Sequence, residues 1–458
     1  MKKKYSVSPR QLALGVLYEI EEQGAYSNLA LGKLLSRVHL PSLERSFLTE
    51  LVYGTVRTKG TLDWVLRQFV KRDLGRIPPR IRLILRMGLY QIMYLDKVPV
   101  SAAVNESVEL AKKYGHAGLV KFVNGVLRNI ARNLNQVEFP SLDEDPVTHI
   151  SLVYYHPEWM VRRWLERYGI EETVALCRAN NRPAVNCIRA NTLKVSREEL
   201  ACRLQQEGIE VQQSPYVPEG LRIAEFSGLD ELASFRQGLF MLQDEASMLA
   251  AHVLKPEAGS FVIDACAAPG SKTTHMAQLM GNRGKIIAWD IHPHRLKLIE
   301  DNCRRLGIDI VEVQLGDARL LGERYPGQAD YLLIDAPCSG LGVLRRRPDA
   351  RWRKNPEKIL ELQKLQLEIL DGAANCLRPG GILVYSTCTL EPEENYLVIE
   401  KFKEKHPGFK TQDLSKFLPF PLEREEDRRM AAKGYIQLLP HVHGTDGFFL
   451  ARLIKNGK

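Results

Sequence analysis

The sequence predicts an α/β protein whose carboxyl-terminal part is a Rossmann-like, doubly wound and mostly parallel sheet. Short apolar runs alternate with helix-like stretches from Phe261 to Lys405, an alternation typical of βαβ units. Several of the apolar runs end close to an acid, namely Asp290, Asp317 or Asp335. Ligands of such sheets bind at the carboxyl ends of the strands. We therefore expect the functional residues at that edge.

The length and composition set limits on the class of protein. With 458 residues, of which 45% are hydrophobic and 26% charged, the chain has room for two to four ordinary globular domains. No apolar run approaches the roughly 20 residues that cross a bilayer. Eight cysteines without a CxxC pair or clustered histidines argue against zinc and for a reducing compartment. We expect a cytoplasmic monomer with neither a metal nor a membrane partner.

Residues 1–140 are predicted to form an all-α domain. From Ser6 to about Leu134 the apolar residues recur at helical spacing, as in Leu12, Val16, Leu17 and Ile20. Pro9 suits the first turn of a helix, because proline lacks the amide proton that this position leaves unused. A polar stretch from about Asn135 to Thr148 is predicted to be a linker.

The positive charge is concentrated in this first domain. Residues 1–140 hold 22 Lys and Arg against 11 Asp and Glu, a net +11, so the other 318 residues carry −2 of the total +9. A basic module beside a nearly neutral one indicates a nucleic-acid partner, although a merely solvated basic surface is the alternative. The candidate phosphate contacts are Arg80, Arg82, Arg86, Lys112, Lys113, Lys121 and Arg128.

Several segments of the first domain resemble the fold of the antitermination factor NusB, an RNA-binding helical domain. They include RQLALGVLYEI, RSFLTELVYGTVR and RLILRMGLYQIMYLDKVP. The resemblance covers most of residues 5–135 and implies that this domain binds RNA.

Residues 141–236 are predicted to hold a helix and a small α+β module of RRM-like type. The helix opens at His156-Pro157-Glu158-Trp159 and runs to about Arg167. The module comprises a strand over 184–193, a helix over 197–207 and short strands over 210–213 and 221–224. Such a module can guide RNA to a catalytic domain, and a purely structural extension is the equal alternative.

Residues 237–458 are predicted to form the catalytic domain. Residues 237–253 pass from a strand or turn into an amphipathic helix that we expect to cover the edge of the main sheet. The predicted strands are 261–265, 286–289, 310–315, 331–334, 382–386, 434–439 and 447–454, and the predicted helices begin at Ser271 and span 295–306, 357–377 and 393–405.

The loop after the first of these strands points to a nucleoside cofactor without an obligatory phosphate. It contains neither GxGxxG nor GxxxxGK[ST], so a phosphate cradle is unsupported. Loop backbone, a helix N-terminus and an acid after the next strand, Asp290, are the parts that hold a ribose in such folds. S-adenosylmethionine fits this description.

Two cysteines stand in equivalent places after strands. Cys338 follows Asp335-Ala336-Pro337, and Cys388 follows Tyr385-Ser386-Thr387. Single cysteines usually pack in the core, but two at strand ends beside acids indicate chemistry. Cytosine C5 is too weak a nucleophile to accept a methyl group until a thiolate adds at C6.

Three segments resemble motifs I, IV and VI of the Sun family of RNA cytosine-5 methyltransferases: DACAAPGSKT, DAPCSG and YSTCTLEPEEN. With the NusB-like part, the whole chain resembles the small-subunit ribosomal RNA methyltransferase B type of that family, also called Fmu or Sun. The resemblance implies methylation of a cytosine C5 in 16S ribosomal RNA, either free or in early assembly. It implies Cys388 as the nucleophile and Cys338 as the residue that assists release. DNA methyltransferases attack with the cysteine equivalent to Cys338, so the presence of both cysteines favours RNA.

The resemblance also implies the cofactor site. Asp290 would hold the ribose, Asp317 the adenine side, and Asp335 the methionine and target base with support from Lys272. Ser271 stands where the motif of the family usually has a second glycine, and serine is a small residue able to cap a helix. Cys266 is interpreted as a residue that packs in the core. The implied cofactor loop is Cys266, Ala267, Ala268, Pro269, Gly270, Ser271 and Lys272.

An arginine-rich segment after Cys338 is a candidate RNA contact. Guanidinium and indole planes can clamp a backbone and stack an unpaired base, and a solvated charge run is the alternative. The candidates are Arg345, Arg346, Arg347, Trp352 and Arg353. Near the end of the chain, HVHGTDGFFLAR resembles a closing element of the family. Here we expect Phe448 and Phe449 in the core, Asp446 in a turn or supporting position, and a structural His443.

Two other functions stay open at this point. A transfer-RNA cytosine-5 methyltransferase is disfavoured by the NusB-like domain. A non-catalytic RNA-binding assembly factor is disfavoured because both cysteines and all three strand-end acids are present.

Overall fold

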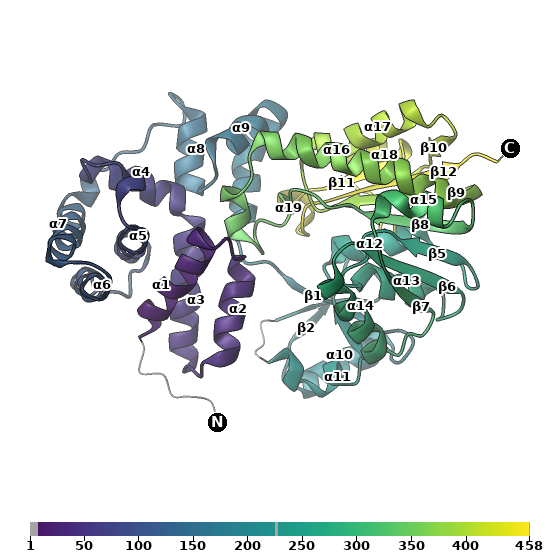
Figure 1. The fold of residues 1–458 in the computed structure, drawn as a ribbon, viewed down its shortest axis with the longest axis horizontal. Helices are drawn as coiled ribbons and strands as arrows, with labels where there is room; N and C mark the ends of the chain where they lie inside the picture. The colour runs from purple at the N-terminus through teal and green to yellow at the C-terminus, as the bar shows by residue number, and fades with distance from the viewer. Residues whose placement is uncertain (1–7, 225–227, 458) are drawn as a thin grey trace. The chain divides into compact units, whose positions relative to one another are not determined.

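The computed structural model describes residues 8–224 and 228–457, and the chain divides into two compact units (Figure 1). Unit 1 comprises the described residues up to Pro183 together with Leu344–Arg353, and unit 2 comprises Ala184–Val343 and the residues from Lys354 onward. The first division therefore falls at 183/184, whereas the sequence predicts boundaries at 140/141 and 236/237. Residues 1–7 of the predicted first domain lie outside the described residues.

Unit 1 is all-α, as predicted. Its first helix begins at Pro9, with the side chain of Ser8 accepting a hydrogen bond from the Gln11 amide. Val16, Leu17 and Ile20 are buried in a core to which all seven amino-terminal helices contribute. These helices are α1 Pro9–Glu22, α2 Ser27–Arg37, α3 Ser42–Arg57, α4 Lys59–Phe69, α5 Pro79–Tyr94, α6 Val100–Tyr114 and α7 Ala117–Asn133.

Arg86 on the central helix α5 corrects one prediction about RNA contacts. Its side chain is 5% exposed and donates to both carboxylate oxygens of Asp63, at 2.6 and 2.7 Å, and to Glu21 at 2.9 Å. A buried guanidinium with two carboxylate partners neutralises charge inside the unit. It is therefore not a phosphate contact.

Two more helices belong to unit 1. Helix α8 (Pro146–Tyr154) begins inside the stretch predicted to be a linker, with Asp145 accepting from the Thr148 amide. Helix α9 (Glu158–Asn181) extends well past Arg167, and it bends at Gly169, whose φ is 75°. That positive φ interrupts the helical periodicity, which is why the sequence pattern ended too early.

The segment Leu344–Arg353 packs on the helices of unit 1. Arg351 is fully buried and donates to Tyr155 O and Asn181 Oδ1, at 2.8 and 2.9 Å. The indole of Trp352 donates to Val56 O at 2.7 Å, and Arg353 donates to Gly24 O at 2.7 Å. Trp352 and Arg353 are thus engaged in hydrogen bonds within unit 1. The prediction that they stack on and clamp RNA is wrong.

The small module at the start of unit 2 is an antiparallel sheet of order β2-β3-β1-β4. Its strands are β1 Asn186–Ala190, β2 Val211–Gln213, β3 Gly220–Ile223 and β4 Phe240–Leu242, with helices α10 Arg197–Gln206 and α11 Ala233–Arg236. Strand β4 lies beyond the predicted boundary at 236/237, because Phe240–Leu242 pairs with β1. The sequence predicted a strand or turn at this place, but it did not indicate that the strand pairs with β1.

The main sheet confirms the predicted doubly wound fold, with the order β10-β12-β9-β8-β5-β6-β7 and β11 paired to β12. Strands β9, β8, β5, β6 and β7 run parallel, and β12 joins β9 antiparallel. The strands are β5 Phe261–Asp264, β6 Lys285–Asp290, β7 Val311–Leu315, β8 Ala329–Asp335, β9 Leu377–Thr387, β10 Phe409–Thr411, β11 Tyr435–Leu438 and β12 Phe448–Lys455. The direction of the strand order reverses at β5, which lies between β6 and β8.

Helices cover both faces of this sheet (Figure 1). Val262 faces the core shared with α12, α13 and α14, whereas its neighbour Ile263 faces the core shared with α15, α16 and α17. This alternation follows from the two-residue period of a strand. The helices are α12 Glu245–Leu254, α13 Ser271–Leu279, α14 Pro293–Leu306, α15 Leu321–Arg324, α16 Pro356–Ala373, α17 Tyr396–Lys405, α18 Glu425–Ala432 and α19 Pro440–His443.

Helix α12 differs from its prediction. It packs on β8, β9 and β12 and therefore covers a face of the sheet, not its edge. Met248, Leu249 and Val253 are fully buried there. In the described part of the chain no helix combines the length and the apolar character needed to cross a bilayer.

Candidate active site

The loop between β5 and α13 approaches Asp290 at the end of β6. Its Ala268–Pro269 peptide is cis, and Gly270, with φ 95°, stands at the cap position of α13. A side chain at Gly270 would be strained by that φ and would meet Ile299 at 3.1 Å. Ser271 is the first residue of the helix, so it does not serve as the cap that the sequence suggested.

Asp290 is held by backbone on two sides. Its Oδ2 accepts from the Ala268 amide at 3.1 Å and its Oδ1 from the His292 amide at 2.9 Å. The Gly316 amide donates to Asp290 O at 3.1 Å, which brings the loop of Asp317 to the same place. A carboxylate with fixed orientation and further lone pairs can accept from ribose hydroxyls.

Asp317 lies after β7 and pairs within its own loop. Its carboxylate accepts from the Arg319 guanidinium, the shortest contact being 2.6 Å, and from the Arg319 amide at 3.0 Å. The hydrogen bonds from Arg319 lower the pKa of Asp317. It is therefore an anion at the strand edge predicted for it.

Asp264 is a buried acid that the sequence reasoning missed. It ends β5 and is 1% exposed, and only its Oδ2 is hydrogen-bonded, by Thr273 Oγ1 at 2.7 Å. Burial, opposed by that bond, raises the pKa of Asp264 to about 7. Burial, together with the neighbouring Asp264, also raises the pKa of Cys266 well above its usual value. This thiol stays protonated and packs, as predicted.

Lys272 and Asp335 form an ion pair between α13 and the end of β8. Lys272 Nζ lies 2.6 Å from Asp335 Oδ2, and Ser386 Oγ donates to Asp335 Oδ1 at 2.8 Å. Burial lowers the pKa of Lys272, but Asp335 outweighs this effect and the pKa ends above its usual value. Lys272 Nζ also lies 5.3 Å from the centroid of the Phe448 ring, a cation–π contact that helps to fix the ion pair.

The two cysteines meet across β8 and β9. Cys338 Sγ lies 3.4 Å from Cys388 Sγ. Hydrogen bonding to Cys388, together with burial, raises the pKa of Cys338 well above its usual value. The Lys272 ammonium interacts electrostatically with Cys388, and a cation favours a thiolate. The arrangement thus holds a protonated Cys338 thiol against the sulfur of Cys388, close to the Lys272 cation.

A second missed residue, Glu394, connects the loops that carry the two cysteines. Its fully buried carboxylate accepts from the amide and hydroxyl of Ser339, at 2.7 and 2.5 Å, and from Thr389 Oγ1 at 3.1 Å. Gln366 Nε2 donates to the same group at 3.1 Å. Ser339 follows Cys338 and Thr389 follows Cys388, so one carboxylate positions both thiols.

The closing element behaves as predicted. Phe448 and Phe449 are 3% and 0% exposed. The ring of His443 accepts from the Leu439 amide at 2.9 Å and contacts Asp427 at 3.2 Å, which is a structural role. Gly447 packs against Gly342, and a side chain on Gly342 would lie 2.2 Å from Gly447 O and 2.8 Å from Cys388 O. Glycines therefore permit the close backbone approach beside Cys388.

Three models of protein families match the chain. A 16S rRNA methyltransferase RsmB/F model matches residues 251–454, a NusB family model matches residues 7–132, and a ferredoxin-like domain model of the RsmF/B type matches residues 156–229. The NusB resemblance is thereby confirmed. The module called RRM-like from sequence is similar to a ferredoxin-like domain.

Curated relatives are similar over the whole length. The probable ribosomal RNA small subunit methyltransferase B of Bacillus subtilis is 41% identical, over 99% of this chain and 100% of the relative. That of Synechocystis is 39% identical over 98% and 100%. The ribosomal RNA small subunit methyltransferase B of Klebsiella pneumoniae is 33% identical over 99% of both chains.

Solved structures agree. The crystal structure of PH0851 has a TM-score of 0.81 at 32% identity and covers 99% of this chain and 100% of its own. NSun6 from Pyrococcus horikoshii, solved with the S-adenosylmethionine analogue SFG, has a TM-score of 0.59 at 29% identity and covers 66% and 99%.

Proposed function

Because the chain belongs to the ribosomal RNA small subunit methyltransferase B family, whose members use S-adenosylmethionine, we propose that it methylates C5 of a cytosine in 16S ribosomal RNA through a covalent bond from Cys388 to C6. The observation that carries the mechanism is the 3.4 Å approach of Cys338 and Cys388 next to the pair of Lys272 and Asp335. The family supplies the class of substrate.

The residues at the strand ends suit the cofactor. Asp290 has oriented lone pairs for ribose hydroxyls, and Asp317 lies beside it for the adenine side. The loop Cys266–Ser271 contains no phosphate-binding signature and turns tightly at Gly270, and Asp335 is the acid for the methionine end. When bound, S-adenosylmethionine supplies an electrophilic methyl group on a sulfonium.

The first step is the addition of Cys388 to the base. The Cys388 thiolate attacks C6 of cytosine, and the electron pair of the C5–C6 double bond moves onto the ring, which makes C5 nucleophilic. Lys272 favours the thiolate before attack. C5 would then take the methyl group as the carbon–sulfur bond of the sulfonium breaks and a neutral thioether leaves, which gives a saturated C5 that carries both the methyl group and its original proton.

The second step is release. A base removes the C5 proton, the electron pair re-forms the C5–C6 double bond, and the C6–S bond breaks to return the Cys388 thiolate. Cys338 lies close enough to Cys388 to act here. Hydrogen bonding to Cys388 raises the pKa of Cys338 in the free enzyme. Once Cys388 is bound to C6 that hydrogen bond is lost, so Cys338 gives up its proton more easily and, as a thiolate, can take the proton from C5.

RNA binding would involve both units. Arg345 and Arg346 are half-buried and Arg347 is exposed, and they follow the Cys338 loop in the chain. Unit 1 adds the basic helices of the NusB-like part. Such contacts provide affinity by neutralising phosphates and are sensitive to salt. We propose free or early-assembly 16S RNA as the substrate, and a cytoplasmic monomer as the working form.

Cysteine variants test the mechanism. Cys388→Ala should abolish methyl transfer while cofactor binding, measured by calorimetry, stays near normal. Cys338→Ala should transfer the methyl group yet fail to release, so a denaturing gel with labelled RNA should show a slow protein–RNA band. The double variant should lack that band. Cys202→Ala, at an exposed cysteine, is the matched control. Normal turnover in Cys388→Ala would remove it from the nucleophile role, and full product without a band in Cys338→Ala would remove Cys338 from release.

A further inference from the structure

Two histidines and a glutamate meet in unit 2. Glu219 Oε1 lies 2.8 Å from His252 Nε2 and 2.6 Å from His275 Nε2. One ligand atom from each residue lies within 4.8 Å of the others, and among residues 8–224 and 228–457 this is the group of three that meets this criterion. The three residues come from the loop before β3, from α12 and from α13, so no spacing in the sequence indicates them.

The cluster is buried, and the contact of His275 with the carboxylate lacks hydrogen-bond geometry. Glu219 is 4% exposed and His275 is 0% exposed. Neither ring nitrogen of His275 has a hydrogen bond of acceptable geometry, although Nε2 is close to the carboxylate. A buried polar atom without a well-aligned hydrogen bond is costly, and a metal ion between Nε2 and the carboxylate would bind the Nε2 lone pair. Burial also favours neutral imidazole, the form that binds metals.

We propose that Glu219, His252 and His275 bind a zinc ion. Two imidazoles and one carboxylate are a known zinc donor set with a fourth position left for water. The contacts of 2.6 and 2.8 Å are shorter than the separation of ligand atoms around a tetrahedral zinc, so the side chains would open by several tenths of an ångström to admit the ion.

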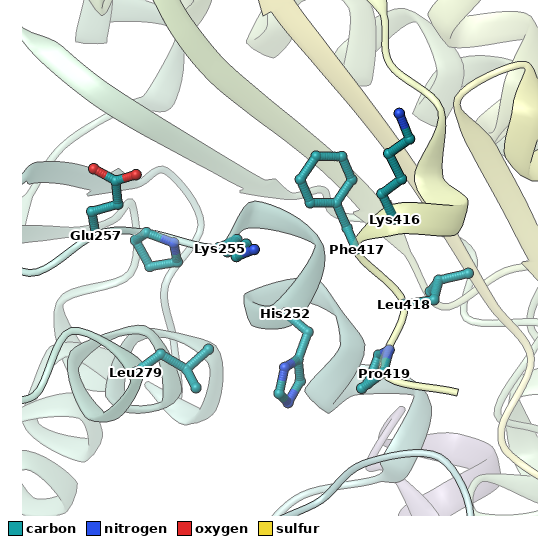
Figure 2. Close-up of a pocket in the computed structure, with 9 residues that line it drawn as sticks. His252, Lys255, Glu257, Leu279, Lys416, Phe417, Leu418 and Pro419 are labelled. Carbon is teal, nitrogen blue, oxygen red and sulfur yellow. The ribbon is translucent and has the colours of Figure 1, made fainter. Parts of the chain in front are cut away.

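An ion has a route to this site from solvent. A cavity of about 420 Å³ has His252 in its wall together with Lys255, Leu279 and Lys416 (Figure 2). The side chain of His252 is 15% exposed, so an ion could bind it first and then reach the buried pair.

The site would tie the small sheet to the cofactor loop. Glu219 O accepts from the Ala190 amide at 2.9 Å, and the adjacent Arg189 donates to Ser271 O at 2.6 Å and Thr274 Oγ1 at 2.9 Å on α13. His275 lies one turn beyond Lys272 on the same helix. Zinc would thus fix α13 against the small sheet, and this role is structural and independent of the methyl transfer proposed above. The Arg189 guanidinium interacts electrostatically with Glu219 and His275, and its positive charge opposes the binding of a cation.

Metal binding to the full-length protein tests the proposal. Protein stripped with a chelator is titrated with Zn²⁺ against a chromophoric competitor, metal content after dialysis is measured by mass spectrometry, and Co²⁺ replaces zinc to report the ligand geometry in the visible spectrum. One zinc per chain is expected, with a thermal midpoint that rises with the zinc concentration. His252→Ala and Glu219→Gln should each weaken binding at least about 100-fold, since even indirect partners of a metal cost about 10–100-fold.

Two controls decide between sites. His292→Ala/His294→Ala removes an exposed histidine pair with ring centroids 5.7 Å apart and should leave binding unchanged. Cys338→Ala/Cys388→Ala excludes the catalytic thiols and should also leave it unchanged. No stoichiometric zinc, iron in its place, or binding that is lost with the cysteines and kept in His252→Ala would overturn the proposal. Glu219→Gln is nearly isosteric and removes only the charge of the ligand. It therefore still tests zinc binding if His252→Ala fails to fold.

Discussion

Replacing Glu394 separates a positioning role from a catalytic one. In Glu394→Ala the Ser339 amide and one N–H of Gln366 lose their acceptor, whereas the hydroxyls of Ser339 and Thr389 keep each other at 2.7 Å. Each orphaned N–H costs about 1–3 kcal/mol. Removing the buried carboxylate also removes its desolvation cost, which offsets part of this loss. The free energy of unfolding should therefore fall by roughly 2–4 kcal/mol, which corresponds to a thermal midpoint lower by about 4–15 °C.

Glu394→Gln should be mild by comparison. The amide oxygen keeps the two N–H donors, and the new NH₂ faces two hydroxyls that can accept. Burial raises the pKa of Glu394, although its hydrogen bonds act in the opposite direction. In the folded chain Glu394 therefore keeps its proton at pH values above 4.5, at which the unfolded chain has already lost it. Stability from this group therefore falls as pH rises through that window, and Glu394→Gln removes the dependence.

The assay combines melting curves with steady-state kinetics. A shift of about 1 Å in a reacting group costs about 100-fold, so kcat should fall about 100-fold in Glu394→Ala and less than about tenfold in Glu394→Gln. The KM for S-adenosylmethionine should stay unchanged in both variants, because Asp290 is held elsewhere. Glu361→Ala, at an exposed ion pair with Lys358, is the control and should change stability by no more than about 0.5 kcal/mol. Equal damage from Glu394→Gln and Glu394→Ala would refute the reasoning, since charge and not position would then matter.

Three further outcomes are expected. Asp290→Ala should weaken S-adenosylmethionine binding by roughly 1.5–3 kcal/mol, the cost of hydrogen bonds to a charged group, and unchanged calorimetric affinity would place the ribose elsewhere. Asp264 has a pKa of about 7 against an ordinary 3.8, so it should reduce stability by up to about 4 kcal/mol as pH rises from about 4 to about 7. Melting of Asp264→Asn should lose that slope, and a persistent slope would contradict the assignment. Replacing Arg345, Arg346 and Arg347 together by alanine should lower the salt slope of RNA binding by roughly 2, and an unchanged slope would exclude them as phosphate contacts.

The sequence by itself determined the elements that rest on local chemistry. The apolar alternation around Phe261–Asp290 specified the order of strands and helices, because the two- and 3.6-residue periods are local properties of the backbone. It also located the strand-end acids and the two cysteines, because parallel strands bring their carboxyl ends to one edge whatever the sheet order is. The family resemblance then supplied the roles of Cys388 and Cys338.

Tertiary structure decided what depends on contacts between distant residues. Trp352 and Arg353 look like RNA contacts in an arginine-rich run, and only their hydrogen bonds to Val56 and Gly24 show that they pack on unit 1. Burial of Glu394 and Asp264 requires the assembled core, since a carboxylate loses water only when other elements cover it. The meeting of His252 and His275 on Glu219 has the same origin: three elements separated in the chain converge on one point that no local pattern encodes.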